Sequence, residues 1–291
     1  MDHRVHGVLA PAAWAPARRA LGLIRVALRV PRPDADRVLA ELLELVPAGV
    51  EEVDAGDHVE YAVYGAPGEL PALPDLRAAA GGALVEVSTS EVADDWADRW
   101  RAFHRPLTVA GRVHVRPPWA PPPPGGLVDV VIDPGRAFGT GAHATTKLSL
   151  ELLVARRPSG ALVDVGCGSG VLAIAAAKLG FAPVMAVDHD PLAVQATADN
   201  ARANHVELEV RRSDLRADPL PAVPNVLANL LRPLLLVLAD RLPHPPPRTL
   251  IASGLLAGEA DEIAAAFAAR GLGERYRRVE GDWAALALGV A

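Results

Sequence analysis

The second half of the chain alternates short apolar runs with helical segments, and this alternation restricts the fold more than any other feature. Strands are predicted at 162–165, 183–188, 206–211, 225–229 and 249–253, and helices at 170–179, 191–204, 233–241 and 259–269. Strands that alternate with helices indicate a parallel, doubly wound sheet. The tail departs from this pattern, because residues 274–290 predict an antiparallel hairpin around Gly281-Asp282. We therefore expect an α/β fold that ends in an antiparallel hairpin.

The first 88 residues carry a different pattern. Predicted elements follow in β-α-β-β-α-β order, with strands at 23–30 and 84–87, helices at 33–45 and 76–80, and a hairpin over 50–64. This order is typical of a small ferredoxin-like α+β domain, a fold that serves many functions.

A helix over 91–104 and the proline-rich stretch 117–126 come next. Because proline and glycine disfavour regular structure, this stretch is typical of a linker. The sequence thus predicts a domain at 1–88, a linker helix with a proline-rich connector at 89–126, and a second domain at 127–291.

Composition argues against several classes of protein. The net charge of −6 disfavours a large nucleic-acid footprint. The single cysteine, Cys167, excludes an internal disulfide, and the nine histidines lack the spacing of a metal site, so no metal is expected. No apolar run is long enough to span a membrane, and the N-terminal stretch lacks the order of a signal peptide. We expect a cytoplasmic protein without membrane or direct nucleic-acid contact.

A glycine-rich turn, Asp164 to Gly170, joins the strand at 162–165 to the next helix. Glycines permit a tight turn and a close approach of the backbone to a ligand. A nicotinamide-binding G-x-G-x-x-G motif would need glycine at position 171, where this chain has Val171. An acid two residues before G-x-G-x-G is instead typical of class I methyltransferases. Their cofactor, S-adenosylmethionine, has an α-ammonium group and no phosphate, which suits a nearby carboxylate such as Asp164.

Polar residues end the neighbouring strands. Asp188 can accept hydrogen bonds from ribose hydroxyls, whereas a helix-capping role suits Asp190 better. Asp214 is placed either to accept from an adenine amino group or to close a turn. The amide of Asn229 offers a donor and an acceptor to a substrate amine or to the methionine part of the cofactor, or it caps the helix that begins near Pro233.

A second glycine-bearing segment lies upstream, from Asp133 to Thr146. Phe138 is placed to cover an adenine or methionine face, and Thr145 or Thr146 to cap the following helix. His143 is a candidate for orienting the incoming nucleophile, although a lone loop histidine is usually only solvated.

Together these motifs resemble the PrmA-type methyltransferases, which modify large-subunit ribosomal protein L-eleven. The similarity spans nearly the whole chain and rests on Asp133–Thr146, Asp164–Gly170, Asp188–Pro191, Ala228–Leu231, Asp95–Trp100, Pro106, Trp119 and Gly281–Trp283. It implies a class I methyltransferase (Rossmann-like) fold, S-adenosylmethionine as the cofactor, and an N-terminal domain that grips the ribosomal protein. It also implies a linker helix that lets the catalytic domain swing between target amines. Two positions depart from the family, where Ala144 replaces a usual proline and Arg232 a usual small residue.

We therefore predict a monomeric enzyme that transfers methyl groups to a lysine ε-amine or an N-terminal α-amine. Asn229 and His143 are the expected catalytic residues, and no metal is expected. The expected cofactor-binding residues are Phe138, Thr145, Thr146, Asp164, Gly166, Gly168, Gly170, Asp188, Asp214 and Asn229. The alternatives are methylation of another protein lysine or of a small molecule, a nicotinamide-dependent oxidoreductase, and a non-enzymatic ribosome-associated protein.

Overall fold

The computed structural model describes residues 3–6, 24–46, 50–65, 70–91, 105–133 and 143–290. These residues form two compact units, one comprising the described residues up to 91 and one comprising those from 105 onward. Residues 92–104 of the predicted linker helix, and Phe138, lie outside the described residues. Within the described part of the chain, no helix combines the length and apolar character needed to cross a lipid bilayer.

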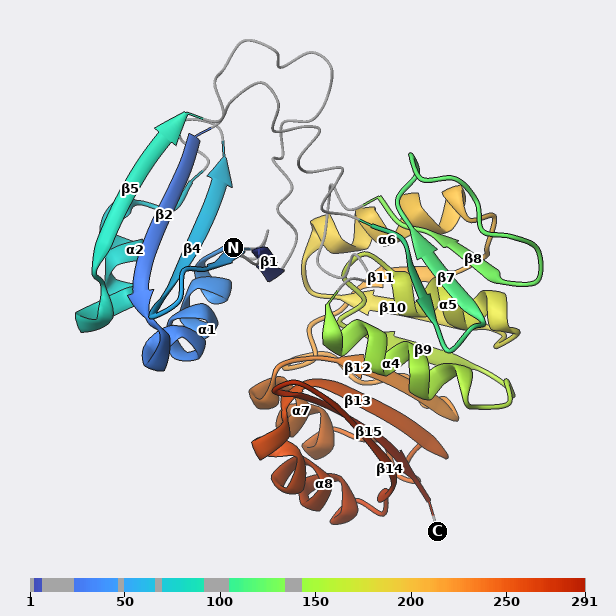
Figure 1. Cartoon of the computed structure of the whole chain (residues 1–291). Coiled ribbons are helices and arrows are strands. Elements are labelled where there is room, and N and C mark those ends of the chain that lie inside the picture. Colours follow the sequence, from blue (N-terminus) through green and yellow to red (C-terminus); the bar gives the residue numbers. More distant parts are fainter. Residues whose placement is uncertain are drawn as a thin grey trace. The chain divides into compact units, whose positions relative to one another are not determined.

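The first unit is an antiparallel sheet with helices on one face (Figure 1). Its elements are β1 (His3–His6), β2 (Ile24–Pro31), the 3-10 turn η1 (Arg32–Asp34), α1 (Ala35–Leu45), β3 (Val50–Asp54), β4 (His58–Gly65), α2 (Leu73–Ala80), η2 (Gly81–Ala83) and β5 (Glu86–Glu91). From β2 onward they follow the predicted β-α-β-β-α-β order, and the sheet order is β1-β3-β4-β2-β5. Alternate residues of β2, such as Leu28 and Val30, pack against Val38 and Leu42 of α1, as a strand with one buried face requires.

The second unit contains a seven-stranded sheet, mostly parallel, with the order β11-β10-β9-β12-β13-β15-β14. The strands are β9 (Leu162–Val165), β10 (Val184–Asp188), β11 (Glu209–Arg212), β12 (Asn225–Asn229), β13 (Thr249–Leu256), β14 (Gly273–Glu280) and β15 (Trp283–Gly289). The predicted C-terminal hairpin is present as the antiparallel pair β14 and β15. The strand order reverses beside β9, because β10 lies on one side and β12 on the other. Open α/β sheets bind ligands at such a reversal, outside the carboxyl ends of the strands.

Helices cover both faces of this sheet (Figure 1). They are α4 (Ala144–Val154), α5 (Val171–Leu179), α6 (Pro191–Ala203), α7 (Arg232–Asp240) and α8 (Ala260–Ala268), with a 3-10 turn η3 (Ala257–Glu259) before α8. Leu227 of β12 packs in one core with α4 and α5, whereas its neighbours Val226 and Ala228 pack in the other with α7 and α8. Because both faces are covered, the central strands are nearly continuous apolar runs.

A small sheet of β6 (Leu107–Val109), β7 (Val113–Arg116) and β8 (Val128–Val131) belongs to the second unit and was not predicted. Val113 and Val130 are buried in the core that contains α4 and α5. The proline-rich stretch is the loop between β7 and β8, and Arg116 closes it through a bidentate ion pair with Asp129 and a bond to the Ala120 carbonyl. The prediction of a connector reaching residue 126 is therefore corrected. Prolines end β7 and leave an exposed loop, which a sequence cannot distinguish from a linker.

Candidate active site

The glycine turn between β9 and α5 depends on backbone conformations that glycine alone adopts readily. Gly166, Gly168 and Gly170 have φ values of 74°, 53° and 81°. At Gly170 an added Cβ would lie 2.8 Å from Thr197 Cγ2, so a larger residue would collide with α6. The backbone N–H groups of Gly166 and Cys167 donate to the Val187 carbonyl at 2.8 and 3.1 Å. These bonds fix the turn against the end of β10.

Asp188 holds the same turn with its side chain. Its Oδ2 accepts from the Gly168 N–H and its Oδ1 from the Asp190 N–H, both at 3.0 Å. Each carboxylate oxygen retains capacity for a second hydrogen bond. Asp190 caps α6 instead, accepting from the Leu192 N–H at 2.8 Å ahead of Pro191. Asp190 therefore has the helix-capping role that the sequence favoured for it, and Asp188 lines the pocket described below.

Asp164 lies beneath the turn and is buried. Its Oδ2 accepts from the Ala173 N–H of α5 at 3.1 Å, whereas its Oδ1 is buried without a hydrogen-bond partner. Burial raises the pKa of this carboxyl to about 7, with the charge of Asp188 adding to the rise and the bond from Ala173 opposing it. A cation above the turn would stabilise the ionised form of Asp164.

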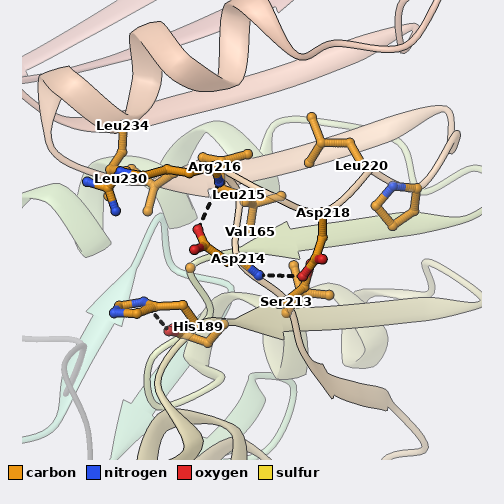
Figure 2. A pocket seen from close by; sticks show the side chains of 14 residues that line it. Val165, His189, Ser213, Asp214, Leu215, Arg216, Asp218, Leu220, Leu230 and Leu234 are labelled. Carbon is orange, nitrogen blue, oxygen red and sulfur yellow. Dashed lines mark hydrogen bonds and ion pairs between the residues drawn. The ribbon is translucent and has the colours of Figure 1, made fainter.

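A pocket opens at the carboxyl ends of β9, β10, β11 and β12 (Figure 2). Leu215, Leu220, Leu230 and Leu234 supply apolar walls, and Asp188, Asp214 and Asp218 supply carboxylates. Asp214 also closes a turn, because its Oδ1 accepts from the Arg216 N–H while its own N–H donates to Asp218, both at 2.8 Å. The position of Asp214 is thus compatible with both predicted roles, accepting from an adenine amino group and closing a turn.

The chemistry of these groups fits a cationic nucleoside better than a dinucleotide. Three carboxylates would repel a pyrophosphate, and Arg216 is the one arginine among the residues lining the pocket. Val171, at the position where a nicotinamide fingerprint has glycine, is buried in the first turn of α5. A ribose needs hydroxyl acceptors, which Asp188 offers, and an adenine needs apolar faces, which the leucines offer.

The second part of the site surrounds Asn229 at the end of β12. Its Nδ2 donates to Thr146 Oγ1 at 3.5 Å, which leaves Oδ1 as the acceptor. The next residue, Leu230, donates its N–H to the Ser253 carbonyl at 2.9 Å. Gly254 makes this approach possible, because at φ 85° an added Cβ would lie 2.5 Å from the Leu230 carbonyl oxygen.

The start of α4 brings the upstream motif beside Asn229. His143 is the N-cap residue, and its Nδ1 lies 3.3 Å from the Thr145 backbone nitrogen, which donates to it, and 2.8 Å from Thr145 Oγ1. The His143 ring also packs edge-on against Trp283, with centroids 4.9 Å apart. Ser253 Oγ donates to the Thr145 carbonyl at 3.0 Å and joins α4 to β13.

The structure thus brings most of the predicted residues together in two adjoining groups. In the first group, Gly166, Asp188 and Asp214 line the pocket, Gly168 and Gly170 belong to the same turn, and buried Asp164 precedes that turn. His143, Thr145, Thr146 and Asn229 form the second group. Among the described residues, no group of three His, Cys, Asp or Glu side chains could hold a metal ion.

Sequence reasoning missed two features of this site. One is Gly254. The other is a polar stripe formed by Thr197 and Asn200 of α6 and by Asn204, the C-cap residue of this helix; the spacing of three and four residues would have signalled a shared face.

The chain is similar to a family of methyltransferases along most of its length. The family model described as Ribosomal protein L11 methyltransferase (PrmA) matches residues 74–289. The ribosomal protein L11 methyltransferase of Bordetella bronchiseptica is 38% identical, over 80% of this chain and 89% of its own. That of Pelotomaculum thermopropionicum is 42% identical, over 69% of this chain and 68% of its own. A solved ribosomal protein L11 methylase from Lactobacillus delbrueckii subsp. bulgaricus, 28% identical, has a TM-score of 0.57 and covers 64% of this chain and 98% of that chain.

Proposed function

Because this chain belongs to the ribosomal protein L11 methyltransferase family, we propose that it transfers methyl groups from S-adenosylmethionine to amino groups of ribosomal protein L11. The acceptors are lysine ε-amines, the N-terminal α-amine, or both. One observation supports this function most directly: the glycine turn, Asp188 and the acidic, leucine-walled pocket meet at the strand-order reversal beside β9.

Each part of the cofactor has a chemically suitable partner. Asp188 accepts from the ribose hydroxyls, and Asp214 accepts from the adenine amino group between leucine side chains. The turn at Gly166 and Gly168 receives the methionine part, and the charge of Asp164 beneath it favours the α-ammonium. When bound, S-adenosylmethionine supplies an activated methyl group, so the protein contributes mainly alignment and exclusion of water.

Asn229 orients the acceptor amine. A lysine amine has an ordinary pKa near 10.4 and must lose a proton before it attacks. The Oδ1 of Asn229, held in place by the Nδ2 contact with Thr146, accepts a hydrogen bond from the neutral amine. The ammonium form of the lysine would lose its proton to solvent before the attack. Bound S-adenosylmethionine would then supply the methyl group, with S-adenosylhomocysteine as the leaving group.

His143 serves as a positioning residue in this scheme. Its Nδ1 lies 3.3 Å from the Thr145 backbone nitrogen and 2.8 Å from Thr145 Oγ1, so this nitrogen is engaged at the start of α4. The ring caps α4 and contacts Trp283.

The proposal extends to the first unit, the location and the oligomeric state. The first unit grips the ribosomal protein, and the enzyme acts in the cytoplasm as a monomer. The net charge of −6 supports recognition of a protein rather than direct contact with nucleic acid.

The function is tested with purified enzyme, methyl-labelled S-adenosylmethionine and purified ribosomal protein L11. We expect label in that protein, located on amines by mass spectrometry, and loss of transfer with Asn229→Ala. In a parallel assay with a cell extract, label that appeared only in another protein would identify that protein as the substrate in place of ribosomal protein L11. The absence of any transfer would refute the enzymatic function. Binding of a nicotinamide dinucleotide in place of S-adenosylhomocysteine would refute the cofactor assignment.

A further inference from the structure

A stripe of three polar side chains, two on α6 and one at its C-cap, faces inward, which is unusual for a helix that covers a sheet. Thr197, Asn200 and Asn204 are 0%, 4% and 4% exposed. Buried polar groups cost stability unless they are hydrogen bonded, and each of these three is. Apart from one bond within the helix, their partners lie in two separate segments, the glycine turn and residues 131–133 at and just after the end of β8.

Among the described residues, the side chain of Thr197 bonds to the glycine turn. Its Oγ1 donates to the Gly168 carbonyl at 2.9 Å and lies 3.3 Å from Cys167 Sγ. Within the described part of the chain, the side chain of Asn204 bonds to β8 and to its own helix. Its Oδ1 accepts from the Val131 N–H at 2.8 Å, and its Nδ2 donates to the carbonyls of Val131 and Asn200.

Asn200 lies between these two residues and binds both segments. Its Nδ2 donates to the Ser169 carbonyl in the glycine turn at 2.9 Å. Its Oδ1 accepts from the Asp133 N–H at 3.0 Å. The two ends of one amide therefore join the turn to the first residue of the Asp133–Thr146 motif, whose other end is held at His143 and Thr145.

We propose that Asn200 is a positioning residue for cofactor binding, which fixes the glycine turn relative to Asp133. This inference rests on the proposed function, because it concerns the site for S-adenosylmethionine. Only asparagine has a donor and an acceptor at this length. Aspartate keeps the acceptor for Asp133 and places a carboxylate oxygen against the Ser169 carbonyl, whereas alanine loses both bonds. Neither variant removes a group that lines the pocket.

The test compares Asn200→Asp and Asn200→Ala with Ala196→Gly in the full-length chain. Ala196 is buried on the same helix, and glycine there destabilises the helix without removing any of these side-chain bonds. S-adenosylhomocysteine affinity is measured by calorimetry, Tm by thermal unfolding, and kcat and KM with ribosomal protein L11. We expect both Asn200 variants to bind S-adenosylhomocysteine about tenfold more weakly or worse, the effect of one buried hydrogen bond lost.

The control, Ala196→Gly, should have a lower Tm than wild type and an unchanged affinity for S-adenosylhomocysteine. In the Asn200 variants the KM for S-adenosylmethionine should rise, whereas the KM for the ribosomal protein should not. Asn200 would be merely structural if a folded Asn200→Asp bound S-adenosylhomocysteine as tightly as wild type. The same would follow if Ala196→Gly, with a Tm equal to that of the Asn200 variants, lost as much affinity as they do. Failure of the wild-type chain to bind S-adenosylhomocysteine would instead refute the proposed function itself.

Discussion

Asp164 and Asp188 lie near the ends of neighbouring strands, yet their surroundings separate their roles. Asp188 borders the pocket and is held by two backbone N–H groups, whereas Asp164 is enclosed beneath the turn with one oxygen unpartnered. A carboxylate at the pocket edge can contact a ligand directly. A buried one acts through its charge, because an unpaired charge is poorly screened in the protein interior.

Replacing Asp188 should abolish most cofactor affinity. Asp188→Ala removes the proposed ribose acceptor together with the bond to the Gly168 N–H. Because hydrogen bonds to a charged group contribute about 1.5–3 kcal/mol, we expect a loss of about 100-fold in S-adenosylhomocysteine affinity by calorimetry. Asp190→Ala is the control, since loss of that cap costs about 1 kcal/mol of stability and leaves the pocket intact. Equal affinity of Asp188→Ala and wild type would contradict the ribose assignment.

Asp164 should make cofactor binding depend on pH. Burial raises its pKa in the folded protein to about 7, above the ordinary value near 3.9. Its contribution to the free energy of unfolding is therefore fully present below about pH 4 and is lost as the pH rises through 7. A bound cation lowers this pKa, so binding of S-adenosylmethionine at about pH 6.5 should release a proton and should tighten as the pH rises.

Proton release is measured by calorimetry in two buffers of different ionisation enthalpy. Asp164→Asn has no carboxyl proton to release, so its binding enthalpy should be the same in both buffers. A wild-type enthalpy that does not depend on the buffer would rule out this role for Asp164.

At the scale of the elements, β13 shapes the loop that follows Asn229. Gly254 lies at an irregularity in the pairing of β13 with β15, and its φ of 85° and lack of a side chain let the Leu230 backbone approach. The glycine therefore sets the path of the chain after β12 and, with it, the position of the Asn229 amide.

Gly254→Ala should displace this loop. Strain at positive φ and the 2.5 Å contact with the Leu230 carbonyl oxygen should lower stability by about 1–3 kcal/mol. We expect kcat to fall about tenfold, with a smaller change in S-adenosylhomocysteine affinity, because Asn229 moves while Asp188 does not. Gly258→Ala is the matched control, since nothing lies within 4 Å of its added Cβ. If both variants had wild-type kcat, Gly254 would have no part in placing Asn229.

For the whole molecule, the second unit contains every described residue of the candidate site and its own two cores. We expect residues 105–291 expressed alone to bind S-adenosylhomocysteine within about twofold of the full chain, because domains with a separate core generally fold alone. The same fragment should methylate ribosomal protein L11 poorly, because the proposed gripping unit is missing. Calorimetry and the methyl-transfer assay check the two halves of this prediction, and full activity of the fragment would contradict the role given to the first unit.

Much of the fold could be predicted, because the strongest sequence patterns fall on helices and strands that the structure contains. The predicted strand at 225–229 matches β12, and the glycine turn follows β9 as expected. Weaker signals failed for physical reasons. β6, β7 and β8 have only three or four residues each, and β11 begins at Glu209 rather than at 206, after a turn in which His205 adopts a positive φ.

The missed site residues share one cause. The polar face of α6 resembles a solvated surface, and its partners at Ser169 and Asp133 lie far away in the sequence. Gly254 resembles any glycine in a strand. Such roles depend on which distant segments meet, and a single sequence does not contain that information.

The edge-on contact of Trp283 with His143 gives the protein an optical reporter of its own. Indole emission responds to the polarity and protonation of its immediate neighbours, and this ring lies beside the residue that caps α4. Fluorescence of a chain in which Trp283 is the sole tryptophan should therefore change as ligand enters, without any attached dye. Such a signal would follow the filling and emptying of the site within a single turnover.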